Sequence, residues 1–128
     1  MINKKTKLLL LIASFMMAIG IFLGAFGAHI LKQFISDELL RVYEIGIKYY
    51  FFNTLGLFII AFILQYKPHS NIIFTSAFLI LIGTLLFSVS LYLLVILKIS
   101  YIAMITPIGG ITLLFGWLLT AIGIIKDL

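Results

Sequence analysis

The stretch that decides the fold class is LLLLIASFMMAIGIFLGAFGAHI, residues 8–30. It contains a single ionisable side chain, His29 near its end, and three lysines lie just before it. The hydrocarbon core of a bilayer is about 30 Å thick, and a helix needs about 20 apolar residues to cross it. A cleaved secretory signal is the alternative, but the apolar region of a signal is only about 7–15 residues long. We therefore predict a retained transmembrane helix.

The composition of the whole chain points the same way. Of its 128 residues, 64% are hydrophobic and 10% are charged, whereas soluble domains carry about 25% charged residues. A soluble domain of this size could not bury so much apolar surface. The chain has no cysteine, which excludes disulfides and thiolate metal sites. The net charge of +5 comes from scattered residues outside the apolar runs, so no nucleic-acid partner is expected.

Four apolar runs predict an all-α membrane protein with four transmembrane helices. The spans are expected at about 8–30, 49–66, 72–97 and 101–125, in a single integral membrane domain covering residues 1–128. Within hydrocarbon every backbone amide needs an internal partner, and runs without alternation satisfy this as helices. The start of the fourth helix has two interpretations. Either Thr106 caps a helix that begins at Pro107, or the helix begins near Ile99 and Pro107 kinks it.

A short amphipathic helix is predicted between the first two spans, at about residues 37–48. Ser36 is a suitable N-cap, and the acids that follow it suit a helix N-terminus. Apolar residues then recur at spacings of three and four, which indicates one apolar face. We expect this helix to lie at the membrane surface, with Gly46 as a hinge into the second span.

Charge predicts the orientation. Four spans place both termini on one side of the membrane, and three lysines flank the first span there. Basic residues next to the first span usually remain cytoplasmic. Both termini are therefore predicted to be cytoplasmic.

Small residues recur on the faces of two predicted helices. Without water, helices associate through close packing, which small residues permit. We predict helix-packing roles for one set on the first span and one on the fourth, with a lipid or ligand along the seam as the alternative. These residues are Gly20, Gly24, Gly27 and Ala28, followed by Gly109, Gly116 and Gly123.

One candidate polar cluster remains. No acidic or basic residue lies near the centre of a predicted span, although such a residue would mark function by default. If the amphipathic helix folds back over the end of the first span, His29, Glu44, Lys48 and Asn53 come together. The two histidines fall on opposite sides of the membrane, so no metal site is expected. No cofactor and no catalytic residue is predicted.

Four short motifs, in this order and spacing, resemble a known family. They are LGAFGAH (23–29), FSVSLY (87–92), TPIGG (106–110) and GW (116–117). The chain is similar over nearly its whole length to the small four-span bacterial membrane proteins of domain-of-unknown-function family 423, also called uncharacterised protein family 0382. The resemblance implies a plasma-membrane location, and it carries over no activity or catalytic residue. Many members have a histidine where Asn53 stands, which favours a packing role for Asn53.

These observations favour a non-enzymatic role over an enzymatic one. We expect a small integral membrane protein that acts through helix association with itself, with another membrane protein or with lipid. A small-molecule or ion transporter that works as an oligomer is the alternative, followed by a membrane enzyme acting on lipid. The expected partners are the lipid bilayer and either a second copy or another membrane protein.

Overall fold

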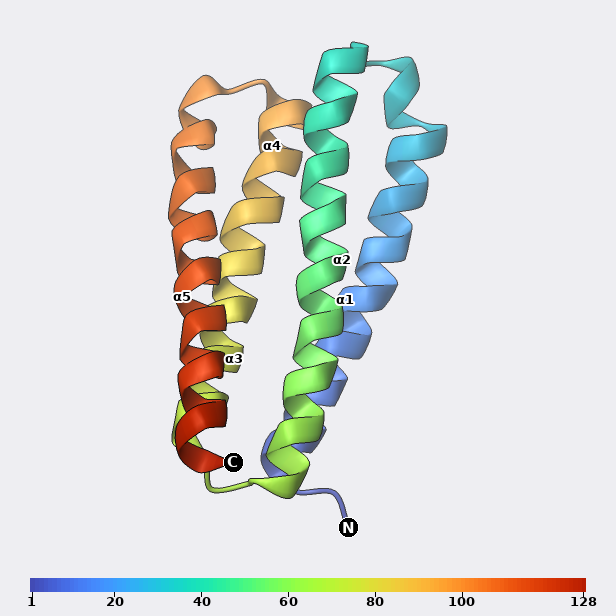
Figure 1. Cartoon of the computed structure of the whole chain (residues 1–128). Helices are drawn as coiled ribbons and strands as arrows, with labels where there is room; N and C mark the ends of the chain where they lie inside the picture. The colour runs from blue at the N-terminus through green and yellow to red at the C-terminus, as the bar shows by residue number, and fades with distance from the viewer.

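The computed structural model describes residues 1–128 and contains helices without strands. Four helical spans are long and apolar enough to cross a membrane. Their elements are α1 (Lys4–His29), η1 (Leu31–Gln33), α2 (Asp37–Tyr66), α3 (Asn71–Thr84), η2 (Leu85–Val89), α4 (Ser90–Leu97), η3 (Ser100–Met104) and α5 (Ile105–Asp127). The predicted four-helix transmembrane fold is confirmed. Both termini lie at one end of the bundle, here called the terminal end (Figure 1).

Helices α1 and α2 form the first antiparallel pair. A Cβ atom at Gly27 would lie 2.4 Å from the Tyr43 ring, and one at Gly20 would lie 2.9 Å from the Tyr50 ring. Bare glycines therefore let α1 approach the aromatic side chains of α2. The Tyr43 hydroxyl donates a 2.6 Å hydrogen bond to the carbonyl of Leu23, which fixes the register of the pair.

The predicted interfacial helix is not a separate element. Residues 37–48 are helical and Ser36 caps them as predicted, accepting a hydrogen bond from the amide of Leu39. However, they continue into the second span as one helix of 30 residues. Gly46 is not a hinge, because it is buried under Tyr92, whose ring would lie 2.7 Å from a Cβ atom there. Tertiary packing thus holds this segment inside the bundle.

The third span is interrupted by one π-helical turn, η2, between α3 and α4. In this region Ser88 donates a 2.8 Å hydrogen bond to the carbonyl of Gly46, and the hydroxyls of Ser90 and Thr106 lie 2.7 Å apart. The irregular turn therefore bonds to α2, and the first residue of α4 bonds to α5. π-Turns within helices are frequent at functional sites.

Helix α5 packs along α3 and η2 at very short range. Cβ atoms at Gly116 and Gly123 would lie 2.8 and 2.5 Å from the side chains of Ile80 and Ile73. At Gly109 the obstacle is backbone, since a Cβ atom would lie 2.3 Å from the Phe87 nitrogen. The helical span begins at Ser100, close to the predicted start near Ile99, and not at Pro107. The 3₁₀ turn η3 leads into α5 at Ile105, and Pro107 sits in the first turn, where its missing N–H is not needed.

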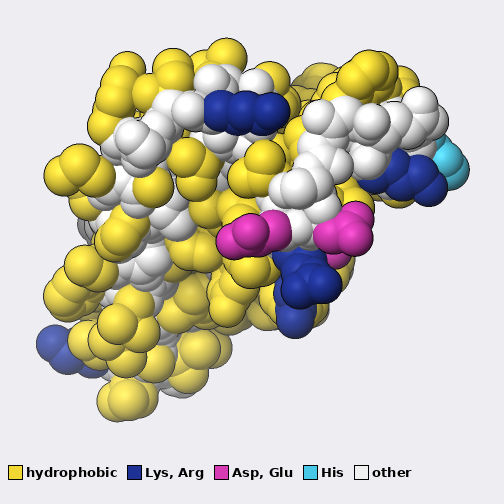
Figure 2. Space-filling view, turned by 90° about the horizontal axis from the view of Figure 1, so that it is seen from above, with side chains coloured by type: hydrophobic (Ala, Val, Ile, Leu, Met, Phe, Trp, Pro, Cys, Tyr) yellow, Lys and Arg dark blue, Asp and Glu magenta, His cyan; other side chains and the backbone are white.

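The two ends of the bundle differ in charge. Five lysines and Asp127 lie toward the terminal end, whereas the opposite end carries four basic and three acidic side chains. Figure 2 looks onto that opposite end and shows acidic and basic side chains mixed there. The terminal end is thus the more basic of the two.

Candidate functional site: a lateral groove between α2 and α5

A groove of about 440 Å³ opens between α2 and α5, the two helices at the front of Figure 1. Its walls come from these helices, and Phe87 of η2 forms its floor. The lining residues are Tyr49, Phe52, Asn53, Phe87, Gly110, Leu113, Leu114 and Trp117. Ligand pockets in proteins span about 300–1,000 Å³ and are mostly apolar with a few polar groups. This groove has that size and composition.

Its polar groups are an amide and an indole that meet across the two walls. Trp117 Nε1 donates a 2.8 Å hydrogen bond to Asn53 Oδ1, and Asn53 Nδ2 donates a 2.8 Å bond to the Tyr49 carbonyl. Asn53 is 6% exposed. Because an amide carries two donor hydrogens and two acceptor lone pairs, each polar atom of Asn53 retains one further bonding position. The groove therefore contains a hydrogen-bonded amide–indole pair with spare bonding capacity in an apolar setting.

Trp117 also closes one end of the groove. A Cβ atom at Gly56 would lie 2.4 Å from the Trp117 ring, so the indole rests directly on the backbone of α2. Trp117 as a whole is 37% exposed. Of the lining residues on α5, Trp117 lies nearest the terminal end.

The width of the groove depends on two adjacent glycines with different surroundings. Gly109 is buried against the backbone of η2 and brings α5 close to the floor. Gly110 is half-buried and lines the groove, where a Cβ atom would lie 3.7 Å from the Phe87 ring, an ordinary contact distance. The first glycine thus sets the helix position, and the second leaves open space.

A cation lies at the edge of the groove. The ammonium of Lys48 is positioned over the Phe52 ring, 5.9 Å from its centroid. Phe52 is 58% exposed and lines the groove. None of the lining residues is charged. Lys48 is therefore a charged residue that lies next to the groove through its contact with Phe52.

In the structure, the four residues of the predicted polar cluster do not line one common pocket. His29 is exposed at the end of α1, beside a shallow apolar hollow on its outer face. Glu44 is exposed on α2, in the third turn of the helix. Only Lys48 and Asn53 relate to the groove, one at its edge and one within it. The role assigned to the cluster stays a prediction.

The seven predicted packing residues also have different surroundings. Gly20 and Gly27 are buried against α2, while Gly109, Gly116 and Gly123 are buried against the third span. Gly24 is half-buried with its nearest neighbours 4.0 Å from a Cβ position, and Ala28 is exposed.

Sequence reasoning did not identify the groove, and it named Trp117 and Gly110 only as parts of motifs. Asn53 and Trp117 are 64 positions apart, and no local pattern connects them. The available signal was the single tryptophan of the chain, since its indole N–H usually finds a partner when buried. A buried carboxamide in another span is the kind of partner that it requires.

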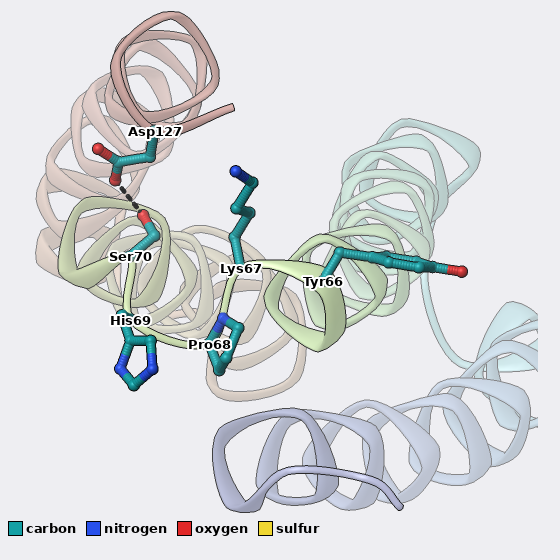
Figure 3. Close-up of a pocket in the computed structure, with 6 residues that line it drawn as sticks. All are labelled: Tyr66, Lys67, Pro68, His69, Ser70 and Asp127. Carbon is teal, nitrogen blue, oxygen red and sulfur yellow. Dashed lines mark hydrogen bonds between the residues drawn. The ribbon is translucent and has the colours of Figure 1, made fainter.

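A second, more polar hollow of about 320 Å³ lies at the terminal end (Figure 3). The loop between α2 and α3 and the end of α5 form it, with Tyr66, Lys67, Pro68, His69, Ser70 and Asp127 as its lining. Ser70 caps α3 and donates a hydrogen bond to Asp127, which ties the loop to α5. In the view of Figure 3 the Lys67 side chain points between α5 and α2, and His69 points away. This contact fastens the ends of two helices together.

Fold and groove together define the class: a small integral membrane protein, built as a four-span helical bundle with a lateral opening. The chain belongs to the family described as "Protein of unknown function (DUF423)", whose model matches residues 23–110.

Three relatives illustrate the match. The chain is 37% identical to UPF0382 membrane protein YwdK of Bacillus subtilis (strain 168), over 88% of this chain and 90% of the relative. It is 35% identical to UPF0382 inner membrane protein YgdD of Escherichia coli (strain K12), over 94% and 92%. It is 40% identical to UPF0382 membrane protein SAB0533 of Staphylococcus aureus (strain bovine RF122 / ET3-1), over 87% and 88%. No solved structure matches the chain.

Proposed function

We propose that this protein acts by lateral binding within the bacterial plasma membrane, and that the groove between α2 and α5 holds the chain of a lipid-like molecule. The observation that carries this proposal is the groove itself. It is about 440 Å³ in volume, it has aromatic and aliphatic walls, and it contains the Asn53–Trp117 pair. Since it lies on the side of the bundle, a ligand would enter from the bilayer.

The physical basis is the shape of the surface that lipid meets. Between transmembrane segments there is no hydrophobic driving force, so selective association depends on close packing and on hydrogen bonds. A flat helix face gives little of either. The groove provides walls on two sides of a chain and an amide with spare bonding capacity, and it is therefore the surface best suited to retain a lipid.

Trp117 allows a direct test, because it is the single tryptophan and it lines the groove. The protein would be reconstituted in vesicles of phosphatidylcholine with brominated acyl chains, which quench indole fluorescence on contact. Gly110→Leu should fill the groove and reduce the quenching. Ala18→Leu adds similar bulk on an exposed part of α1 outside the groove, and it should leave the quenching unchanged. Equal quenching in the wild type and Gly110→Leu would refute the proposal.

We further propose that both termini face the cytoplasm. Lys4, Lys5 and Lys7 flank the first span, and the loop at the terminal end carries Lys67. Basic residues next to transmembrane helices favour the cytoplasmic side. The more basic end of the bundle is thus assigned to the cytoplasm.

The absence of native cysteine makes this orientation testable by labelling. Single cysteines would replace His69 at the terminal end and Lys32 at the opposite end, both of which are exposed. A membrane-impermeant maleimide should label Lys32→Cys in intact spheroplasts and His69→Cys only after lysis. The reverse pattern would show that the termini face outward.

A further inference from the structure

We infer that the ligand of the groove is an anionic phospholipid from the leaflet opposite the terminal end, with its phosphate at Lys48 and an acyl chain along the groove. This inference rests on the proposed function and adds to it a headgroup class and a direction. It is carried by the position of Lys48, both relative to the groove and relative to the apolar surface of the bundle.

The first observation is the link between the ammonium and the cavity. Lys48 precedes Tyr49 and lies one turn before Phe52, and both aromatic residues line the groove. Its ammonium lies over the Phe52 ring rather than away from it. Asn53 is five residues further along α2, which corresponds to about 7.5 Å along the helix axis. A headgroup held by Lys48 therefore places its chain beside Asn53 and Trp117.

The second observation is the depth of this lysine. The hydrogen bond from Ser88 to the Gly46 carbonyl aligns α2 with the third span, and Lys48 lies slightly beyond that level toward the terminal end. From Ser88 the third span continues for nine residues to Leu97, about 13 Å. Its outer surface there is apolar and exposed, with Leu93, Ile96 and Leu97. On α2 itself, Lys48 is the last charged residue before the uncharged run of residues 49–66, so it marks the edge of the apolar part of that helix.

A lysine on an exposed face at this edge favours an anionic partner, because an isolated charge next to hydrocarbon is costly. The nearest acid along α2 is Glu44, one turn closer to the helix start and also exposed. The groove itself contributes no carboxylate. A lipid phosphate has the charge that Lys48 requires and belongs to a molecule whose chain suits the adjoining cavity.

The position of Trp117 indicates from which leaflet the acyl chain enters the groove. Its ring rests on Gly56 and closes the groove on the side of the terminal end. A lipid of the leaflet at the terminal end would meet this closed side. A lipid of the opposite leaflet meets the open side, with Lys48 at its headgroup and the indole near the middle of its chain.

The experiment measures headgroup preference through Trp117 quenching. Vesicles would contain phosphatidylcholine with a fraction of either brominated phosphatidylglycerol or brominated phosphatidylcholine. One basic residue near an anionic surface contributes about 1 kcal/mol, which corresponds to a preference of about fivefold. We expect the wild type and Lys48→Arg to show this preference for phosphatidylglycerol, and Lys48→Gln to lose it.

Lys32→Gln is the matched control, since Lys32 is exposed at the same end but lies outside the groove. It should retain the preference. A preference that survives in Lys48→Gln, or that disappears equally in Lys32→Gln, would overturn the assignment of the headgroup. Weak quenching of the wild type by every brominated lipid would also overturn it, because a second copy or another protein would then cover the groove.

The two proposals fail separately. If Gly110→Leu reduces quenching by brominated phosphatidylcholine but Lys48→Gln does not change the preference for phosphatidylglycerol, the groove binds lipid without the proposed headgroup contact. If Gly110→Leu changes nothing, lipid binding in the groove is refuted, whatever the effect of Lys48.

Discussion

Adding one methyl group to each of two adjacent glycines in α5 should affect the stability of the protein very differently. A Cβ atom at Gly109 would lie 2.3 Å from the nitrogen and 2.7 Å from the Cα atom of Phe87, and 2.8 Å from the carbonyl carbon of Leu86. All three are backbone atoms of η2, so no side chain can rotate to make room. At Gly110 the nearest atoms are on the Phe87 ring, at 3.7 and 3.8 Å.

The expected magnitudes follow from these distances. Overpacking a well-packed core costs about 1–3 kcal/mol, and a clash with backbone belongs at the upper end of that range. Replacing glycine by alanine inside a helix returns about 1 kcal/mol through helix propensity. Gly109→Ala should therefore lower the free energy of unfolding by about 2 kcal/mol. Gly110→Ala should leave it unchanged or raise it by up to about 1 kcal/mol.

The measurement is unfolding of the purified protein in dodecyl maltoside micelles by increasing fractions of sodium dodecyl sulfate. Circular dichroism reports the helices, and the fluorescence of Trp117 reports the contact between α5 and α2. The difference of about 2–3 kcal/mol between the two variants corresponds to about thirtyfold or more in the unfolding equilibrium. If Gly109→Ala unfolds at the wild-type detergent fraction, or if both variants shift equally, the close approach of α5 to η2 is not what determines stability.

Three further substitutions test other contacts by the same unfolding assay. Gly27→Ala should destabilise the protein by about 1–3 kcal/mol, because its Cβ atom would lie 2.4 Å from a buried tyrosine ring. Gly24→Ala should be tolerated, since it has 4.0 Å of clearance; equal losses at both positions would contradict this account of the α1–α2 contact. Ser88→Ala removes the hydrogen bond to α2 and should cost about 0.6 kcal/mol, the average for interhelical bonds in a membrane; Ser88→Thr, which keeps the hydroxyl, is its control. Trp117→Phe keeps an aromatic ring but removes the donor to Asn53. This substitution should also lower the free energy of unfolding by about 0.6 kcal/mol. An unchanged free energy of unfolding would show that this bond does not contribute to folding.

The four-span architecture could be predicted because the transfer of a helix into lipid depends on local composition. A run such as residues 8–30 carries its signal in about 20 consecutive side chains, and each contributes almost independently of the rest of the chain. The cap at Ser36 was predictable for the same reason, since a side-chain oxygen bonds to an amide three residues away.

The prediction of a separate interfacial helix was not confirmed, because an amphipathic pattern does not specify what covers its apolar face. Tyr43 and Gly46 suit a membrane surface as well as a neighbouring helix. The contact between Gly46 and Tyr92 decides between them, and it joins residues 46 positions apart. The local pattern identified the buried face, and only packing identified its partner.

The amino-acid sequence alone determined that the protein has four transmembrane spans and that glycines recur on two of them. Both features depend only on which residues occur and at what spacing. The tertiary structure decided which glycines contact backbone and which leave a groove, and it joined Asn53 to Trp117. These features depend on the relative register of helices that are distant in the chain. A rotation of α5 by about 100° about its own axis would point Gly110 in the direction that Gly109 now faces, without altering any local preference. Long-range packing therefore created the candidate site.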